Sequence, residues 1–574
     1  MKQETMISLQ DVSFQYRNQT EPTLKHIDLE VCRGHKVLLT GPSGSGKSTL
    51  GNLLNGVIPE EFPGELTGQI TINGHAVSEL DLTSLSFEVG TVLQDPDAQF
   101  VALTVAEDMA FALENDAQPV SKLHARVKEW AEILKMPQLL DQKPQELSGG
   151  QKQRVALAGV LIDNEPILLL DEPLANLDPA AGRASLELLD TLAKERNLTV
   201  LVIDHRIEEA LQIHFDKLVV LAEGEIVAND SPDEVLRSDV LLRNGLREPL
   251  YVTALKDAAV DLAALSDLDD LLGLQLETKA QKKLHSWQAQ LPAPSAKEKG
   301  APLLSGRGLT FGYPGKPAIF QDFDFEIQTG EMAALVGQNG TGKTTLINLI
   351  TGFLKPQAGS LTLAGRPLLD LSVKERAEKI GYVLQDPNQM ISKTNVSDEI
   401  ALGLVLRGVP AAEQTARLEK ILRVTGLYPY RHWPISALSF GQKKRVTIAS
   451  VLVLEPQVLI LDEPTAGQDL AHYAKMMDFL RLMNEQLGVT VLMVTHDMNL
   501  MLSYADRALV LDQGQLLAQA APAQVLTDAQ LIKRAHLSQL SLQVLANKSG
   551  ITDAIGFAEK FTIHERSKDN ARRA

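Results

Sequence analysis

The sequence predicts an α/β protein with two tandem domains of the same kind, each built around a mostly parallel sheet. Three observations predict this class. The 574 residues are too many for one ordinary core and enough for two large domains. One ordered series of motifs occurs twice along the chain. In both halves, continuous apolar runs end in glycine, acidic or histidine residues, which is typical of central strands covered on both faces.

The repeat has a nearly constant spacing. The motif lysine recurs 296 positions later, and the motifs that follow it recur 291 positions later. The difference lies in a Pro/Glu-rich segment, Ile58–Glu65, which predicts an extra loop in the first half. The matching pairs are Lys47 and Lys343, Gln94 and Gln385, Ser148 and Ser439, Asp171 and Asp462, and His205 and His496.

Three apolar runs in each half predict the sheet cores. They lie at 37–40 and 332–336 before glycine loops, at 167–170 and 458–461 before Asp-Glu, and at 200–203 and 491–494 near a histidine. Each predicted strand therefore has polar residues at its carboxyl end, where open α/β sheets bind ligands.

The division of the chain follows from the repeat. The Pro/Ala-rich, charged segment 291–300 marks a linker, and the Leu/Ala/Asp-rich stretch 258–274 has helical spacing and predicts an accessory helix. The polar residues 560–574 predict a frayed end. We expect a first domain at 1–245, an accessory helix and linker at 246–302, a second domain at 303–545 and a C-terminal tail at 546–574.

Composition narrows the function. The chain has 44% hydrophobic and 22% charged residues, as globular proteins do, and its formal charge of −18 argues against broad binding to nucleic acid or anionic lipid. The single cysteine, Cys32, excludes a disulfide within the chain and argues against a cysteine-based zinc site. We find no secretion signal in residues 1–10 and no apolar run near the ~20 residues of a membrane span, so a transport pore would be another chain.

Each half contains the pattern G-x-x-x-x-G-K-[ST] directly after a predicted strand. Glycines let backbone N–H groups wrap around phosphates, and the N-terminus of the next helix adds positive charge. The lysines are expected to meet the outer phosphates, and Ser48 and Thr344 to offer a hydroxyl to Mg²⁺. The alternative, a Gly-rich turn with an exposed lysine, is disfavoured by two matches in register. The predicted nucleotide-binding residues are Gly41, Pro42, Ser43, Gly44, Ser45, Gly46, Lys47 and Ser48, with Gly337, Gln338, Asn339, Gly340, Thr341, Gly342, Lys343 and Thr344.

One acidic pair follows the second predicted strand of each half. We assign Asp171 and Asp462 as Mg²⁺ ligands, and Glu172 and Glu463 as general bases that polarise the attacking water. The alternative is a solvated acidic turn. The strand before each pair and the phosphate loop upstream favour the catalytic interpretation.

Polar residues at two further strand ends complete the candidate site. His205 and His496 could bond the γ-phosphate and orient the water, although a histidine after a strand is more often a satisfied turn residue. Gln94 and Gln385 lie in Leu-Gln-Asp-Pro segments, where an amide can bind Mg²⁺ or water, although Asp-Pro alone signals a turn. Their recurrence at the shared spacing favours function for all four.

Two tyrosines stand at similar distances before the motif lysines. Tyr16 precedes Lys47 by 31 positions and Tyr313 precedes Lys343 by 30. A tyrosine there could stack on adenine. An aromatic residue packed on the core at a strand end is the other interpretation, and the residues alone leave both open.

The segment Leu147–Gln151 reads L-S-G-G-Q and, with the other motifs, resembles the signature of ABC ATPases. Leu438–Gln442 is similar, with Phe440 where the first half has Gly149. The resemblance covers both halves. It implies two ATP-hydrolysing domains, each a mostly parallel sheet core with an antiparallel β subdomain and a helical subdomain.

In that family, two domains pack head to tail around two ATP molecules, and each signature completes the site of the other domain. The resemblance implies Ser439 and Gly441 at the Lys47 site, and Ser148 and Gly150 at the Lys343 site. A serine hydroxyl and a helix N-terminus would then reach the γ-phosphate from across the interface.

Two further features follow from the family pattern. Asp178 and Asp469 match the segment that links the two sites. Phe440 departs from the pattern, and its bulk could hinder close approach to phosphate. The Lys47 site is therefore predicted to be the weaker one and still active, because Glu172, His205 and Gln94 remain.

Within this family, Gln94–Phe100, Thr104-Val105 and Phe111–Asn115 resemble the energy-coupling-factor group, and Gln385–Met390 is similar but less complete. That group imports vitamins and metal ions through small binding subunits and a shared scaffold protein. The extra loop at 58–65 resembles fused double-ATPase members, some associated with thiamine-precursor uptake. The resemblance implies a peripheral ATPase at the cytoplasmic face of the cell membrane, with integral membrane partners and no nucleic acid.

Three other functions remain as alternatives. A soluble tandem ABC protein acting on ribosomes would carry a long, strongly charged helical linker, which 246–302 does not resemble. A fused sugar-import ATPase typically has weakened motifs in its second half, whereas Glu463 and His496 are intact. A non-catalytic regulatory module is disfavoured by two complete sets of hydrolytic groups. Nothing in the chain identifies the transported solute.

Overall fold

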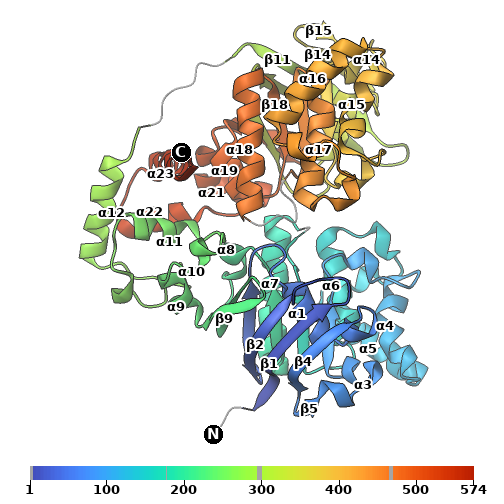
Figure 1. Cartoon of the computed structure of the whole chain (residues 1–574), viewed down its shortest axis with the longest axis vertical. Coiled ribbons are helices and arrows are strands. Elements are labelled where there is room, and N and C mark those ends of the chain that lie inside the picture. The colour runs from blue at the N-terminus through green and yellow to red at the C-terminus, as the bar shows by residue number, and fades with distance from the viewer. Residues whose placement is uncertain (1–3, 176, 294–299, 465–469, 574) are drawn as a thin grey trace. The chain divides into compact units, whose positions relative to one another are not determined.

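The computed structural model describes residues 4–175, 177–293, 300–464 and 470–573. It divides into two compact units, one formed mainly by Met1–Trp287 and the other mainly by the chain from Gln288 onward (Figure 1). Each unit contains a four-stranded antiparallel sheet and a six-stranded, mostly parallel sheet. The predicted α/β class with two tandem domains of the same kind is therefore confirmed.

The sheets of the first unit form from residues whose side chains are buried on one or both faces. The antiparallel sheet has the order β2-β1-β4-β5, and the larger sheet has the order β10-β9-β3-β8-β7-β6. Only β10 runs antiparallel in the larger sheet. The strands are β1 (Thr5–Tyr16), β2 (Leu24–Cys32), β3 (Lys36–Thr40), β4 (Gly64–Ile72), β5 (His75–Ala76), β6 (Val89–Val92), β7 (Ile167–Asp171), β8 (Thr199–Ile203), β9 (Lys217–Ala222) and β10 (Glu225–Asp230).

The helices of the first unit follow strands or connect them. The predicted extra loop contains the short helix α2, and β4 begins at Gly64. The helices are α1 (Lys47–Leu54), α2 (Val57–Glu60), α3 (Leu82–Ser86), α4 (Val105–Asn115), α5 (Val120–Ile133), α6 (Gly149–Leu161), α7 (Pro179–Arg196), α8 (Ile207–Ala210), α9 (Pro232–Arg237), α10 (Val240–Arg243), α11 (Leu250–Asp257) and α12 (Thr278–Gln290).

The second unit repeats the same strand orders, β12-β11-β14-β15 and β16-β17-β18-β13-β19-β20, the second order being written from the opposite edge. Its strands are β11 (Pro302–Gly312), β12 (Ala318–Gln328), β13 (Met332–Val336), β14 (Ala358–Leu363), β15 (Arg366–Pro367), β16 (Ile380–Val383), β17 (Val458–Asp462), β18 (Thr490–Val494), β19 (Arg507–Asp512) and β20 (Gln515–Ala520). Its helices are α13 (Lys343–Thr351), α14 (Val373–Ala377), α15 (Val396–Leu406), α16 (Ala411–Val424), α17 (Phe440–Leu452), α18 (Leu470–Leu487), α19 (Met498–Tyr504), α20 (Pro522–Thr527), α21 (Ala529–Ala535), α22 (Ser541–Ser549) and α23 (Ala554–Arg573).

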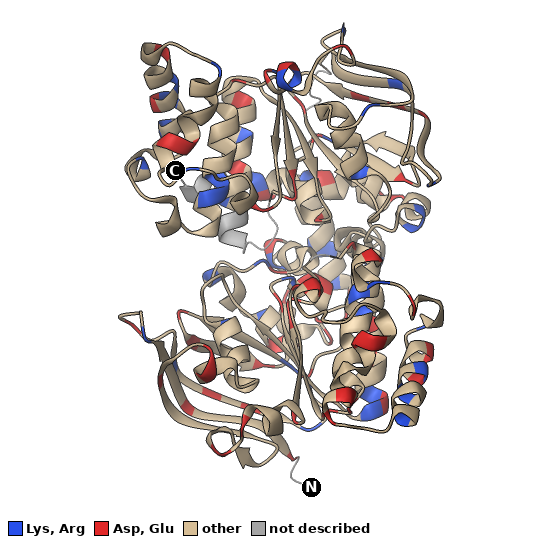
Figure 2. Cartoon of the chain, turned by 90° about the vertical axis from the view of Figure 1, so that its right-hand side faces the viewer, with Lys and Arg blue, Asp and Glu red and all other residues tan. Residues whose placement is uncertain are grey.

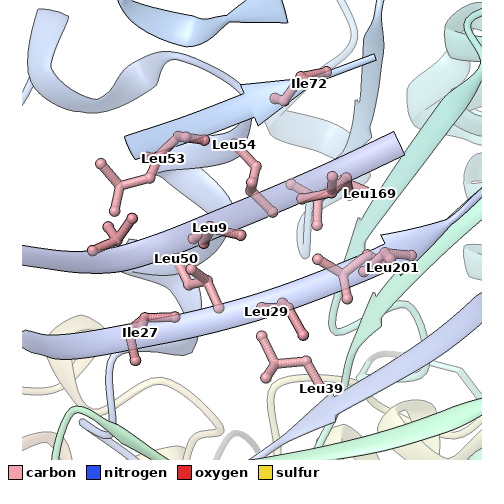
Figure 3. Packing of buried hydrophobic residues seen from close by; sticks show 14 of the residues in the cluster. Leu9, Ile27, Leu29, Leu39, Leu50, Leu53, Leu54, Ile72, Leu169 and Leu201 are labelled. Atoms are coloured by element: carbon pink, nitrogen blue, oxygen red, sulfur yellow. The ribbon is translucent and has the colours of Figure 1, made fainter. Parts of the chain in front are cut away.

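One apolar core joins the two sheets of the first unit through α1. Leu50, Leu53 and Leu54 of that helix pack between the antiparallel sheet and the parallel sheet (Figure 3). The second unit has the matching core around α13. Because α1 and α13 begin at the motif lysines, this packing fixes the phosphate loop against both sheets.

The predicted accessory helix at 258–274 is wrong. The segment contains only a 3-10 turn at Leu262–Ala264, and Asp267 adopts a left-handed backbone. Arg237 donates to the carbonyls of Leu262 and Leu265, and Tyr251 donates to that of Leu268, while the backbone bonds within the segment, such as Leu265 N–H to Leu262 O, form separate turns. The helical spacing of its leucines therefore reflects burial without a helix, and helices α11 and α12 flank the segment.

The predicted frayed end at 560–574 is also wrong, since residues 554–573 form α23. Phe557 and Phe561 are buried, and Arg566 donates from Nε to the carbonyl of Ser503 at 2.6 Å. The tail is ordered by this packing on its own unit. The predicted linker at 291–300 lies largely outside the described residues.

Acidic and basic residues are interspersed along the helices of both units (Figure 2). Among the residues that the structure describes, no helix combines the length and apolar character that a membrane span needs.

Candidate functional site

The two phosphate loops lie between a buried strand and the N-terminus of a core helix, as predicted. In the first half the loop joins β3 to α1, and in the second half it joins β13 to α13. Gly46 and Gly342 occupy the N-cap positions with φ of 103° and 106°. Side-chain-bearing residues avoid this region, so glycine is needed for the chain to turn from loop to helix.

Both motif lysines point into their own loops. Lys47 Nζ donates to the carbonyls of Gly41 at 2.8 Å and Pro42 at 3.0 Å. Lys343 Nζ donates in the same way to Gly337 at 2.7 Å and Gln338 at 2.8 Å. Each ammonium group is thereby bonded to two carbonyls of its own loop.

The candidate general bases have an unusual backbone. Glu172 and Glu463 have φ of 45° and 42°, in the left-handed region that non-glycine residues rarely adopt. Their N–H groups bond to the ends of the neighbouring strands, to Ile203 O at 2.8 Å and to Val494 O at 3.0 Å. Such local strain is concentrated at functional sites, and the neighbouring strand maintains it here.

Each candidate histidine lies beside its glutamate. His205 Nδ1 is 3.6 Å from Glu172 Oε1, and His496 Nε2 is 3.6 Å from Glu463 Oε1. Burial acts to raise the pKa of Glu172, but the adjacent His205 and then Lys47 outweigh burial and lower it. Burial acts to lower the pKa of His205, and the carboxylates of Glu172 and Asp204 outweigh it and raise it. The pair therefore lowers the pKa of the Glu172 carboxyl and raises that of the His205 imidazole.

The candidate magnesium ligands are buried carboxyl groups at the ends of β7 and β17. Burial raises the pKa of Asp171 to about 6, with Glu172 adding to the shift. Burial also raises the pKa of Asp462. Carboxylate, hydroxyl and amide oxygens are hard donors that suit Mg²⁺, whose charge would stabilise the ionised form of the two aspartates. The residues present therefore fit this ion.

The two candidate glutamines are placed at the edge of each parallel sheet, after β6 and after β16. Gln94 Nε2 donates to Glu172 Oε2 at 2.7 Å, so the structure brings these two predicted residues together. In the second half, the backbone carbonyl of Gln385 accepts from Lys444 at 2.6 Å.

The two candidate adenine-stacking tyrosines lie against the helices that follow the phosphate loops. Tyr16 Oη is 3.0 Å from Thr49 Oγ1, and Tyr313 Oη is 3.5 Å from Thr345 Oγ1. Tyr16 also packs at the margin of the first core. Both tyrosines therefore contact the helices that follow the loops, and Tyr16 is partly buried whereas Tyr313 is exposed.

The signature serines stand at helix N-termini. Ser148 caps α6 and Ser439 caps α17, and the side chains of Gln151 and Gln442 complete each capping box. Phe440, the first residue of α17, is 43% exposed. Asp178 caps α7 by accepting from Ala181 N–H at 2.9 Å, whereas Asp469 lies outside the described residues.

Some residues of the site were not singled out from the sequence. Tyr382 donates to Asp462 Oδ2 at 3.1 Å, and Lys444 lies buried near Asp462 and Glu463, where burial lowers its pKa to about 8. Aligning the halves could have found both, because Thr91 and Gln153 occupy the matching positions in the first half.

The chain matches the family described as ABC transporter at residues 24–175 and 320–466. It also matches the family described as ATP-binding cassette cobalt transporter at residues 238–311.

The chain is similar to two full-length relatives, each named as an ABC transporter ATP-binding protein. One, from Lactiplantibacillus plantarum, is 55% identical over 98% of this chain and 99% of its own length. The other, from Enterococcus faecalis, is 53% identical over 98% of both chains. The solved structure of CbiO1 from Clostridium perfringens, described as part of the ABC transporter complex CbiONQ, is 35% identical, covers 41% of this chain and 94% of its own, and has a TM-score of 0.39.

Proposed function

We propose a transport function on the premise that this chain belongs to the family of ABC transporter ATP-binding proteins. Family membership makes it an ATP-hydrolysing enzyme with two ATPase domains in one chain. Its proposed task is to power uptake of a small solute, such as a metal ion, vitamin or vitamin precursor, through separate membrane subunits. The match of residues 238–311 to a family described as a cobalt transporter carries this proposal and favours a metal ion.

The proposed hydrolytic roles follow from the contacts within each half. The N–H groups and lysine of each phosphate loop bind the phosphates, and Glu172 or Glu463 accepts a proton from the attacking water. His205 or His496, adjacent to that glutamate, orients the water and the γ-phosphate. The left-handed backbone of each glutamate is supporting evidence, because it aims the carboxylate from the end of its strand.

Magnesium is the proposed cofactor. The residues that would hold it are Ser48, Gln94 and Asp171 in the first half, and Thr344, Gln385 and Asp462 in the second. When bound, the ion would neutralise phosphate charge. Asp171 and Asp462 would then be ionised despite their burial.

The two halves are proposed to pair with each other around two nucleotides. Ser439 and Gly441 would complete the Lys47 site, and Ser148 and Gly150 the Lys343 site. The capping geometry supports this role, because each serine leaves a helix N-terminus with N–H groups available to an anion.

The proposed partners are integral membrane subunits, namely a scaffold protein and a substrate-binding component. In the second unit, a cavity of about 610 Å³ lies beside the Gln385 segment and is lined mainly by apolar side chains. Phe353, which lines it, is 62% exposed, and Arg407 also lines it. A helix of the scaffold subunit, with an apolar face and an acidic end, fits this lining and would place the protein at the cytoplasmic face of the membrane.

The proposal is tested by uptake in the native host. Cells lacking the protein are complemented with the wild type or with the Glu172→Gln/Glu463→Gln variant, and uptake of Co²⁺ and of radiolabelled vitamins is measured. We expect uptake of one of these solutes to be restored by the wild type alone. Equal uptake in all strains, with the protein sedimenting with ribosomes, would exclude transport in favour of translation.

A further inference from the structure

We propose that Lys444 is a positioning residue that fixes the Gln385 loop, residues 384–390, in the second half. In the first half, an ion pair between Lys152 and Asp97 fixes the corresponding loop. The inference deepens the proposed function, because Gln385 belongs to the hydrolysis site proposed above.

Lys444 lies on α17, the helix that begins at the signature serine, and is 1% exposed. Its Nζ donates to the carbonyl of Leu384 at 2.7 Å and to that of Gln385 at 2.6 Å. These carbonyls belong to the peptide groups on either side of the Gln385 Cα. The ammonium therefore fixes both peptides from which the Gln385 side chain projects, in a place where water cannot compete for the donors.

The first half has Gln153 at the position of Lys444. Its side-chain amide donates to the carbonyl of Pro173, next to Glu172, and so bonds to another segment. The preceding residue, Lys152, reaches the loop instead, because its Nζ lies 2.7 and 2.6 Å from the two carboxylate oxygens of Asp97. Asp97 is 49% exposed.

The second half lacks the counterpart of that ion pair. Asn388 stands where the first half has Asp97, and Lys443 Nζ is 3.4 Å from its neutral amide oxygen. Each half thus has one strong lysine contact from its signature helix to its glutamine loop, at adjacent positions of the helix. The half that lacks the carboxylate is therefore the half that has the buried lysine.

The two contacts differ in their response to salt. The Lys152 side chain is 17% exposed and that of Asp97 is 49% exposed, so ions can screen this pair as ionic strength rises, whereas they do not reach the buried Lys444 ammonium. The Gln94 loop, residues 93–99, should therefore loosen in salt, and the Gln385 loop should not.

The test uses the full-length protein carrying Glu172→Gln, in which hydrolysis reports on the site that retains Glu463. Adding Lys444→Gln, which introduces the residue that the first half has at this position, should raise amide hydrogen exchange in 384–390. It should also lower kcat about tenfold, with KM for ATP and Tm little changed. Lys444→Arg, which keeps N–H donors at this position, should partly restore the parent exchange in 384–390 and the parent kcat. Lys443→Gln is the matched control and should leave both at the parent values.

A second measurement compares the loops without using activity. Raising salt to roughly 0.5 M should increase exchange in 93–99 and leave 384–390 unchanged. The inference is overturned if Lys444→Gln leaves exchange in 384–390 and kcat at the parent values, or if it lowers only Tm. An inactive Glu172→Gln parent would contradict the proposed hydrolytic roles, and the exchange comparison would still decide the role of Lys444.

Discussion

The side-chain amide of Gln94 donates a hydrogen bond of 2.7 Å to the carboxylate of Glu172. Gln94 follows β6 and Glu172 follows β7, and these strands are parallel neighbours in the sheet. The contact therefore joins a loop at the sheet edge to the proposed general base. A shift of this loop would therefore change the hydrogen bond to the Glu172 carboxylate.

Removal of this contact should slow hydrolysis. In a Glu463→Gln parent, which leaves the site with Glu172, we expect Gln94→Ala to lower ATPase activity about tenfold, because Glu172 loses a charge-assisted hydrogen bond. Steady-state ATPase assays measure the effect. Gln142→Ala, a change at an exposed glutamine of the same unit, is the control. Full activity of Gln94→Ala would show that the hydrogen bond has no catalytic role.

The two sites should differ in activity because Phe440 stands in the second signature. Under the proposed pairing, Phe440 narrows the approach to phosphate at the Lys47 site. Glu463→Gln should therefore abolish more of the total ATPase activity than Glu172→Gln. Equal loss in the two variants would refute the asymmetry.

Replacement of Phe440 tests the cause of that difference. Phe440→Gly should raise hydrolysis in the Glu463→Gln parent severalfold, because the side chain is partly exposed and its loss opens the helix N-terminus. Gly149→Phe should produce the opposite effect in the Glu172→Gln parent. The prediction fails if Phe440→Gly leaves the rate of its parent unchanged.

A buried carboxyl in the first unit should make stability depend on pH. Glu165 is 7% exposed, and burial raises its pKa to about 8, with Asp163 and Asp116 adding to the shift. The raised pKa means that the folded state favours the protonated form. The stabilisation is complete below the unfolded pKa, near 4.5, and is lost as pH rises towards 8.

Glu165→Gln keeps a neutral side chain at every pH and removes this loss. We therefore expect its Tm to exceed that of the wild type above pH 8 and to approach it near pH 5. Each pKa unit corresponds to about 1.4 kcal/mol, so part of the shift is enough to detect. Scanning calorimetry of both proteins at several pH values measures this difference in Tm. If the two Tm values change with pH in parallel, Glu165 is not neutral in the folded state.

The cavity beside the Gln385 loop should be needed for membrane association. Phe353→Asp places a charge in its lining, and we expect the variant to leave the membrane fraction of native cells while keeping its Tm. Leu272→Asp, at a leucine that is 68% exposed in the first unit, is the control. Unchanged membrane association of Phe353→Asp would exclude this cavity as the docking surface.

Much of this architecture could be predicted because function and burial leave strong local patterns. The apolar runs before Gly41, Asp171 and His205 became β3, β7 and β8, since strands covered on both faces have few polar positions. The capping box around Ser148 could likewise be predicted, as a serine with a glutamine three residues later begins a helix.

The predictions from sequence were wrong where tertiary contacts outweighed the local sequence pattern. The leucines of 258–274 have helical spacing, but the backbone forms only a short 3-10 turn, and Arg237 and Tyr251 donate to three of its carbonyls. The polar end of the chain forms α23 because Phe557 and Phe561 find a surface on the same unit. The contact of Lys444 with a loop 59 positions earlier has no local signature at all.

One polypeptide carries both sets of hydrolytic groups, so the two halves are always made in equal numbers. An assembly of identical copies would have to carry any substitution at both of its sites. Here Phe440, Asn388 and Lys444 occur in one half alone, and the other half keeps its own residues. Covalent fusion thus allows the residues of one site to change without changing those of the other, so the two sites can differ in activity.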